Sequence, residues 1–201
     1  PVQLKSKTPN ATFWIYRPNN LAWPVNVSER SGEEVKETNI GGLTNGYSNK
    51  YDSLVREKAK EYGVDPILAL AMMQAESSVK LDAVSEDDAI GLMQIIPTTG
   101  LLKCKLTREQ LFNPEANINC GVMIISQLLD KYKENDERIN LVIAAYFCGE
   151  GCVDPLLKEH VYFYKLFKEL GPKTQNHVSK VNAKKKAIEE EAIKEAKEES
   201  V

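Results

Sequence analysis

Residues 65–76 set the fold class of this chain, and they read Asp65-Pro66-Ile67-Leu68-Ala69-Leu70-Ala71-Met72-Met73-Gln74-Ala75-Glu76. The pair Asp65-Pro66 predicts a helix start, because aspartate caps the first free amides and proline fits the first helical position. The apolar residues that follow predict a helix with a broad apolar stripe. Glu76 stands on that stripe, one and two turns beyond Met72 and Leu68. An acidic side chain in such a place is the first candidate for chemistry.

The segments on either side of this stretch also carry helical patterns. Apolar residues recur every three or four positions, and Gly63 ends the first segment. The expected helices are 51–62, 65–76, 118–132, 139–147 and 156–169. Residues 81–100 hold Gly91, Pro97 and Gly100 and are expected to be more broken. The sequence therefore predicts a mainly α domain over 51–170.

The two ends of the chain differ from this middle. Residues 1–50 are rich in proline and glycine and predict an irregular N-terminal arm, with one short strand at 13–16. Residues 171–201 are dominated by Lys, Glu and Ala, and we expect a charged, partly helical or disordered tail. Either end is a hypothetical docking segment for a partner, although packing on its own domain and solvation are the simpler interpretations. Deleting residues 172–201 is then expected to spare activity.

Composition narrows the function classes. The 201 residues are 42% hydrophobic and 27% charged, with a net charge of −3, which argues against a general nucleic-acid binder. No apolar run reaches the roughly 20 residues of a membrane span. The chain begins at Pro1 without an apolar leader, so a signal peptide was either absent or removed.

The four cysteines favour an oxidising compartment. They are Cys104, Cys120, Cys148 and Cys152. Two disulfides are the favoured interpretation, and Cys104–Cys120 with Cys148–Cys152 is the simplest of three pairings. Reduced structural cysteines are the alternative. A zinc site is disfavoured, because no C-x2-C pair and no histidine pair is present, and we expect no metal or cofactor.

The position of Glu76 predicts an unusual protonation state. Its helical neighbours are apolar, and it stands near the negative end of the helix dipole. Both effects favour the neutral carboxyl and raise the pKa, which suits a general acid near neutral pH. A buried glutamate held by a salt bridge or by backbone donors is the alternative.

The residues around Glu76 resemble the signature of soluble-type (SLT) lytic transglycosylases. Glu76-Ser77 is followed by Ala83-Val84-Ser85, Gly91-Leu92-Met93-Gln94 and Pro97-Thr98. Two later blocks also match in family order. The first is Leu111-Phe112-Asn113-Pro114 with Asn117-Ile118 and Gly121, and the second is Ala144-Ala145-Tyr146 with Gly149 and Gly151. The resemblance covers residues 51–170 and implies a lysozyme-like helical fold with a cleft for a sugar polymer.

Carried over position by position, the resemblance assigns roles to six residues. Glu76 is the expected catalytic acid/base. Ser85, Gln94 and Met93 match cleft positions near the N-acetylated sugar, and Tyr146 matches a tyrosine beside the acid. Glu159 is a weaker match to the glutamate of a late E-T-x-x-Y-V motif, because His160 and Phe163 replace its Thr and Tyr.

Other positions depart from the family pattern. Val79 stands where Phe is usual, and Asp88 stands where Gly is common. Phe147 replaces the Asn after Tyr146, which removes one polar cleft contact, and Cys148 follows it. Residues 148–152 are then expected to form a disulfide-pinned loop that fixes Tyr146, with a reactive thiol pair as the alternative.

The resemblance implies a lyase reaction on peptidoglycan with one carboxylate. The acid protonates the oxygen between N-acetylmuramic acid (MurNAc) and N-acetylglucosamine (GlcNAc). It then accepts the proton of the MurNAc C6 hydroxyl, whose oxygen attacks C1, so that a 1,6-anhydro end forms. Glycosidases usually use two carboxylates, and Asp82, Asp87 and Asp88 are candidates for a second. A hydrolytic goose-type lysozyme and a non-catalytic peptidoglycan-binding module are therefore the competing hypotheses.

The resemblance also bears on place and partners. We expect a periplasmic or cell-envelope location, with peptidoglycan strands as the main partner. Small enzymes of this family often open the wall for secretion, conjugation or flagellar machines, and service to such a complex is a further hypothesis.

Overall fold

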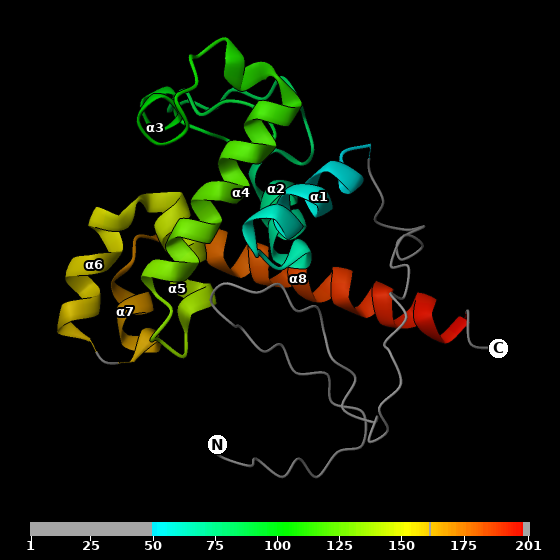
Figure 1. Cartoon of the computed structure of the whole chain (residues 1–201). Coiled ribbons are helices and arrows are strands. Elements are labelled where there is room, and N and C mark those ends of the chain that lie inside the picture. Colours follow the sequence, from blue (N-terminus) through cyan, green and yellow to red (C-terminus); the bar gives the residue numbers. More distant parts are fainter. Residues whose placement is uncertain (1–49, 161, 199–201) are drawn as a thin grey trace, which may run out of the picture. The chain divides into compact units, whose positions relative to one another are not determined.

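The computed structural model describes residues 50–160 and 162–198, and these are mainly helical (Figure 1). The predicted arm, with its strand at 13–16, lies outside the described residues apart from residue 50. No described helix is both long and apolar enough to cross a membrane. The helical elements are α1 (Asp52–Tyr62), α2 (Pro66–Ser77), α3 (Pro97–Thr99), η2 (Gly100–Cys104), η3 (Gln110–Phe112), α4 (Pro114–Lys131), α5 (Arg138–Cys148), α6 (Glu150–Glu159), α7 (Phe163–Glu169) and α8 (Pro172–Glu198).

The junction between α1 and α2 confirms the predicted boundaries. Gly63 adopts a left-handed conformation with φ of 66° and ends α1. The Asp65 carboxylate then accepts a hydrogen bond from the backbone N–H of Ile67 at 2.9 Å, with Pro66 in the first helical position. Local capping chemistry therefore sets where α2 begins and, in turn, where Glu76 falls along it.

Helix α4 begins earlier than the predicted start at residue 118. The Asn113 side chain accepts a hydrogen bond from the Ala116 N–H at 3.0 Å, and Pro114 takes the first helical position. This is the same aspartate- or asparagine-proline start that opens α2. The first turn of α4 carries Asn117 into the core, where the side chain is fully buried.

The predicted helix over 156–169 is wrong. Its residues belong to the end of α6 and to α7, and the two are separated where His160 and Tyr162 take extended backbone conformations. Helix α6 begins directly after Gly149, and Pro155 lies inside it. Since the apolar spacing continues across the break, periodicity alone did not reveal it.

Both disulfides take the simplest pairing. Cys104–Cys120 ties η2 to α4, and Cys148–Cys152 ties the end of α5 to the first turn of α6. The expected disulfides, and this pairing among the three, are confirmed.

The region expected to be a charged, partly helical or disordered tail contains α8, a helix of 27 residues. One face is buried, and its buried side chains are Thr174, His177, Val178, Val181 and Ile188. This face packs against α2 and α5, and Figure 1 shows α8 running past both helices. The expectation that residues 172–201 are dispensable therefore does not fit the structure, because their removal would uncover α2.

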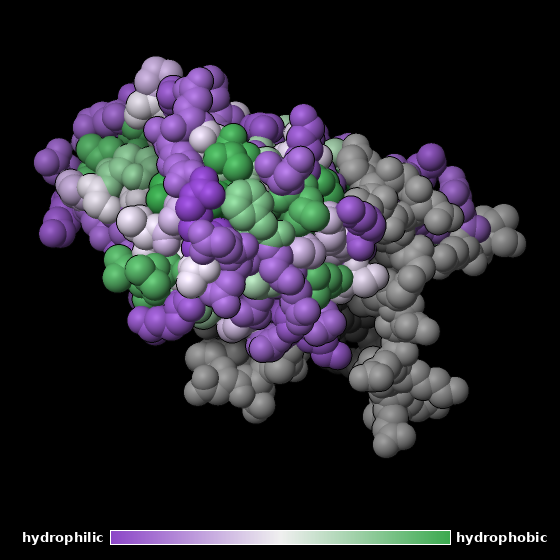
Figure 2. All heavy atoms as spheres, turned by 90° about the horizontal axis from the view of Figure 1, so that it is seen from above, coloured by the Kyte–Doolittle hydropathy of each residue, from purple (hydrophilic) through white to green (hydrophobic). Residues whose placement is uncertain are grey.

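Helix α2 lies in the middle of the core. It contacts α1 and α8, and α4 joins the assembly through α1 and α5. On the face seen in Figure 2, hydrophobic side chains are exposed in patches between hydrophilic ones. The long broken segment between α2 and α4 exposes Val84, Ile96, Leu101 and Leu102. The fold therefore buries α2 and leaves apolar side chains in the following segment open to solvent.

Candidate active site

Glu76 lies in the last turn of α2, and its side chain is only 9% exposed. Burial disfavours the charged carboxylate and raises the pKa of Glu76 to about 8, while the positive charge of Lys180 opposes this shift. The predicted direction of the shift agrees with this result. At neutral pH the carboxyl is therefore mainly protonated, which is the state that a general acid needs.

His177 of α8 is a titratable neighbour of Glu76. Its Nε2 lies 3.3 Å from Glu76 Oε1, and its side chain is 6% exposed. Burial, with the nearby charge of Lys180, lowers the pKa of His177 to about 4. At neutral pH an uncharged imidazole therefore faces an uncharged carboxyl.

Phe147 stacks on His177. The ring centroids are 4.4 Å apart and the rings are inclined by 18°. Phe147 is the residue that stands where the resembled pattern has Asn. The Phe147 ring thus packs on a residue of α8, which gives this difference from the family pattern a structural role.

Lys180 joins α8 to the end of α2. Its Nζ donates a hydrogen bond to the backbone carbonyl of Ala75. Carbonyls in the last turn of a helix lack intrahelical donors, and a cation there is favourable. The positive charge of the same ammonium lowers the pKa of Glu76.

Tyr146 links α5 to the segment after α2. Its hydroxyl donates a hydrogen bond to the Met93 carbonyl at 2.8 Å. Burial, and then the nearby Glu76, raise the pKa of Tyr146 well above its usual value. The structure therefore brings Tyr146 into the neighbourhood of Glu76, as the resemblance implied.

Residues 83–96 form a compact loop held by backbone pairs at Val84–Ile90 and Ile90–Ile95. Ser85 Oγ accepts a hydrogen bond from the Ala89 N–H at 3.0 Å. Gln94 has a positive φ of 47°, and its Nε2 donates to the carbonyls of Ala83 and Gly91 at 3.2 and 3.0 Å. Ser85 and Gln94 thus shape the loop, and these bonds leave Gln94 Oε1 for other partners.

Asn117 anchors this loop to α4. Its Oδ1 accepts from the Met93 N–H at 2.7 Å, and its Nδ2 donates to the carbonyls of Ile90 and Leu111 at 2.9 Å each. Gly91 is required beside it, because a Cβ there would lie 2.6 Å from Asn117 Nδ2, and φ is 77°. One buried amide therefore holds the segment that carries Gln94.

The Met93 side chain lies in the core, not on an exposed surface. It is fully buried and packs so closely on Gly121 that a Cβ on that glycine would come within 2.7 Å. Its backbone meets Tyr146 and Asn117. Met93 therefore supports the loop from beneath.

The three aspartates considered as a second carboxylate are exposed. Asp88 pairs with Arg108 at 2.6 Å, which gives it a role on the surface of the loop. Within the described residues, Lys180 is the charged group that shifts the pKa of Glu76, and no carboxylate does so.

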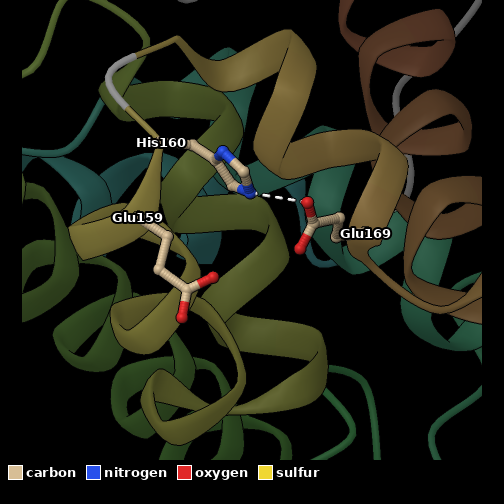
Figure 3. Close-up of side chains that lie close together, drawn as sticks. All are labelled: Glu159, His160 and Glu169. Atoms are coloured by element: carbon tan, nitrogen blue, oxygen red, sulfur yellow. Dashed lines mark ion pairs between the residues drawn. The ribbon is translucent and has the colours of Figure 1, made fainter.

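Glu159 lies in a different cluster, at the end of α6. Figure 3 shows it beside His160 and Glu169, and His160 Nε2 pairs with Glu169 Oε1 at 2.6 Å. Among the described residues these three could offer atoms to a metal, with the candidate ligand atoms within 4.8 Å of one another. The ion pair accounts for their closeness, and the exposed Glu159 has no described contact with Glu76.

The sequence interpretation did not identify His177 and Lys180. The signal was present, because Thr174, Val178, Val181 and Ile188 are spaced by four, three and seven residues. That spacing marks one face of a helix. The surrounding lysines and glutamates concealed it when the segment was judged by composition.

Comparison with known proteins agrees with this geometry. Residues 53–161 match the Transglycosylase SLT domain family. Membrane-bound lytic murein transglycosylase C of Yersinia pestis (strain Pestoides F) is 41% identical over 118 residues, covering 53% of this chain and 33% of that protein. Its counterpart in Histophilus somni (strain 2336) is 36% identical over the same length and is covered to 32%. The chain spans about a third of these relatives.

Solved structures extend the comparison to the fold. An inactive variant of the lytic transglycosylase Slt from Pseudomonas aeruginosa aligns with a TM-score of 0.60 at 26% identity, covering 69% of this chain and 24% of that one. The 70 kDa soluble lytic transglycosylase of Escherichia coli aligns with a TM-score of 0.60 at 24% identity, covering 67% and 23%. The expected lysozyme-like, mainly helical fold is confirmed.

Proposed function

Because the chain belongs to the Transglycosylase SLT domain family, we propose that it cleaves the MurNAc–GlcNAc bond of peptidoglycan as a lytic transglycosylase. Glu76 is its single acid/base, and the products carry 1,6-anhydro-MurNAc ends. The observation that carries the proposal is the burial of Glu76, which raises its pKa to about 8.

The first step needs a protonated Glu76. With a pKa of about 8, the carboxyl holds its proton at neutral pH and gives it to the glycosidic oxygen. The carboxylate then takes the proton of the C6 hydroxyl as that oxygen attacks C1. The proton taken from the C6 hydroxyl replaces the one given to the leaving group, so the enzyme returns to its starting state without water.

A single carboxylate is consistent with the surroundings of Glu76. An inverting hydrolase would need a second carboxylate to activate water across the sugar. The exposed aspartates of the 81–90 segment do not shift the pKa of Glu76. The solved P. aeruginosa enzyme, which was made inactive by exchange of a glutamate for glutamine, supports a single essential glutamate by analogy.

Ser85, Gln94 and Tyr146 position the sugar in this proposal. Gln94 presents Oε1, and Tyr146 presents its ring beside the acid. Met93 contributes through its backbone, since its side chain is buried. Glu159 contributes a contact only to more distant parts of the glycan, because its described neighbours are His160 and Glu169.

The proposed catalytic unit begins at residue 51 and includes α8, so it does not end at residue 170. The relatives named membrane-bound lytic murein transglycosylase C support a cell-envelope location. Service to a secretion, conjugation or flagellar complex, with the arm over 1–50 as a docking segment, is part of the same hypothesis.

The test is digestion of purified sacculi by the wild type and by Glu76→Gln. Wild type should release anhydro-muropeptides, and Glu76→Gln should reduce that release by about 1000-fold or more, since the amide cannot donate an acid proton. Mass spectrometry separates the alternatives. Reducing ends, heavier by one water, would identify a hydrolase, and binding without soluble products would identify a non-catalytic module. Full activity of Glu76→Gln would exclude Glu76 as the acid.

A further inference from the structure

Glu76 and His177 lie close together without a hydrogen bond between them. The two atoms are 3.3 Å apart, yet His177 Nε2 is buried and makes no hydrogen bond. A buried polar atom without a partner costs free energy, so it is expected to have a function or a partner in another state. Catalytic hydrogen bonds are often long or misaligned before substrate binds.

We infer that His177 is a positioning residue for Glu76: its Nε2–H donates to Glu76 Oε1, in a bond that strengthens when the carboxyl ionises, with or without substrate, and it holds the carboxyl in one orientation. With Oε1 held on the α8 side, Oε2 carries the acid proton and faces the sugar. This inference rests on the proposed acid/base role of Glu76.

The same hydrogen bond helps the second half of the reaction. After Glu76 gives up its proton it is a carboxylate in a site that burial makes unfavourable for charge. A donor 3.3 Å away stabilises that anion. His177 therefore offsets part of the burial penalty at the moment when Glu76 becomes a base.

Phe147 holds the imidazole in the plane that this contact needs. Its ring lies nearly parallel to that of His177, at 4.4 Å between centroids. Such stacking restricts rotation of the imidazole about its side-chain bonds. An asparagine at position 147, as in the resembled pattern, would offer no such face. Phe147 and His177 therefore form a pair.

The other groups around Glu76 are accounted for. From α8, Lys180 contributes a positive charge and is bonded to the Ala75 carbonyl. From α5, Tyr146 is near, and its hydroxyl is bonded to the Met93 carbonyl. Both groups are bonded to backbone carbonyls, whereas His177 Nε2 lies 3.3 Å from Glu76 Oε1 and has no other hydrogen-bond partner.

The test uses three substitutions of one residue in the whole chain. In His177→Gln the side-chain amide nitrogen can reach Oε1. In His177→Asn the amide is one carbon shorter and cannot, and His177→Leu keeps the volume but has no donor. We expect His177→Gln to keep kcat within about threefold, while the Asn and Leu variants lose about 10- to 100-fold, with KM nearly unchanged, which is the effect of one charge-assisted hydrogen bond.

The pH dependence adds a measurement that a purely structural role would not change. Loss of a donor to the carboxylate raises the pKa of Glu76, so the alkaline limb of kcat/KM should move to higher pH in His177→Leu and stay in place in His177→Gln. Equal losses in all three variants, or an unmoved limb in His177→Leu, would overturn the inference.

A second readout does not depend on activity. Carbon-13 NMR of the glutamate carboxyls, with the Glu76 signal assigned by its absence in Glu76→Gln, follows the titration directly. The Glu76 pKa should rise in His177→Leu and hardly change in His177→Gln. If wild type proved inactive on sacculi while this titration behaved as expected, the proposed function would fail and the contact would stand. An unchanged titration with an active wild type would reject only the contact.

Discussion

Helices α2 and α8 meet at Glu76, yet their amino-acid compositions are opposite: α2 is mostly apolar and α8 is mostly polar or charged. Helix α2 buries nine of its 12 residues, and Glu76 and Gln74 are among the few polar ones. Helix α8 buries five of its 27 residues, and most of the others are Lys, Glu or Ala. Helix α2 is therefore apolar on nearly all of its faces, whereas α8 has only a narrow stripe of buried residues.

The difference shows that a narrow stripe of buried residues is enough to pack a helix onto the core when only one of its faces is covered. The buried positions of α8 recur at helical spacing, and they include two polar side chains, Thr174 and His177, of which His177 contacts Glu76. The long solvated face contributes nothing to that contact. Composition describes the whole helix, whereas packing depends on the few residues of one face.

The largest expected effect comes from breaking the stripe of α8. Val181 is fully buried, and Val181→Asp would place a charge between packed helices. We expect a loss of about 3 kcal/mol or more in the free energy of unfolding. Thermal and urea unfolding would measure it. The matched control is Ala183→Asp on the exposed face, which should cost less than about 1 kcal/mol. Equal effects would mean that α8 does not stabilise the core.

A smaller effect concerns the acid on α2 and depends on pH. The pKa of Glu76 is about 8 when folded, against an ordinary value of 4.5. A raised folded pKa means that the folded state binds more protons, so wild type loses stability as pH rises from 4.5 to 8. Glu76→Gln cannot ionise and escapes this loss.

Relative to wild type, Glu76→Gln should therefore gain on the order of 2–4 kcal/mol between pH 5 and pH 9. Unfolding curves at a series of pH values would show the gain. Protonation of His177 below pH 6.5 also lowers stability, but it does so in both proteins. Exposed Glu134→Gln serves as the control and should show no such trend. A constant difference across the range would contradict the burial of Glu76.

The smallest effect concerns the cation between the two helices. Lys180 lowers the pKa of both Glu76 and His177. Lys180→Met should therefore raise the pKa of both groups and move the alkaline limb of kcat/KM to higher pH. Lys186→Met, on the exposed side of α8, is the control. A downward shift after Lys180→Met would show that the charge does not act on Glu76.

Local signals predicted α2 correctly. Asp65 and Pro66 define its start through contacts within three residues, and the apolar run defines its buried face. The burial of Glu76 followed from the same run. The family resemblance added Tyr146, which the structure brings near Glu76, and the order of the motif blocks predicted the fold.

Contacts between distant segments were beyond the local signals. Asn117 reaches three backbone groups in two other segments, and nothing near it in sequence reveals those partners. His177 meets Glu76 only because α8 returns across α2. The separation of α6 from α7 depends on backbone conformations at His160 and Tyr162 that apolar spacing does not encode.

The bond from Lys180 to the Ala75 carbonyl joins residues 105 positions apart. During synthesis, residues 66–77 leave the ribosome well before residues 172–198. The last turn of α2 then lacks the ammonium that binds its carbonyl, and the acid lacks the helix that buries it. The burial that raises the pKa of Glu76 is therefore complete only after residues 172–198 have folded onto α2.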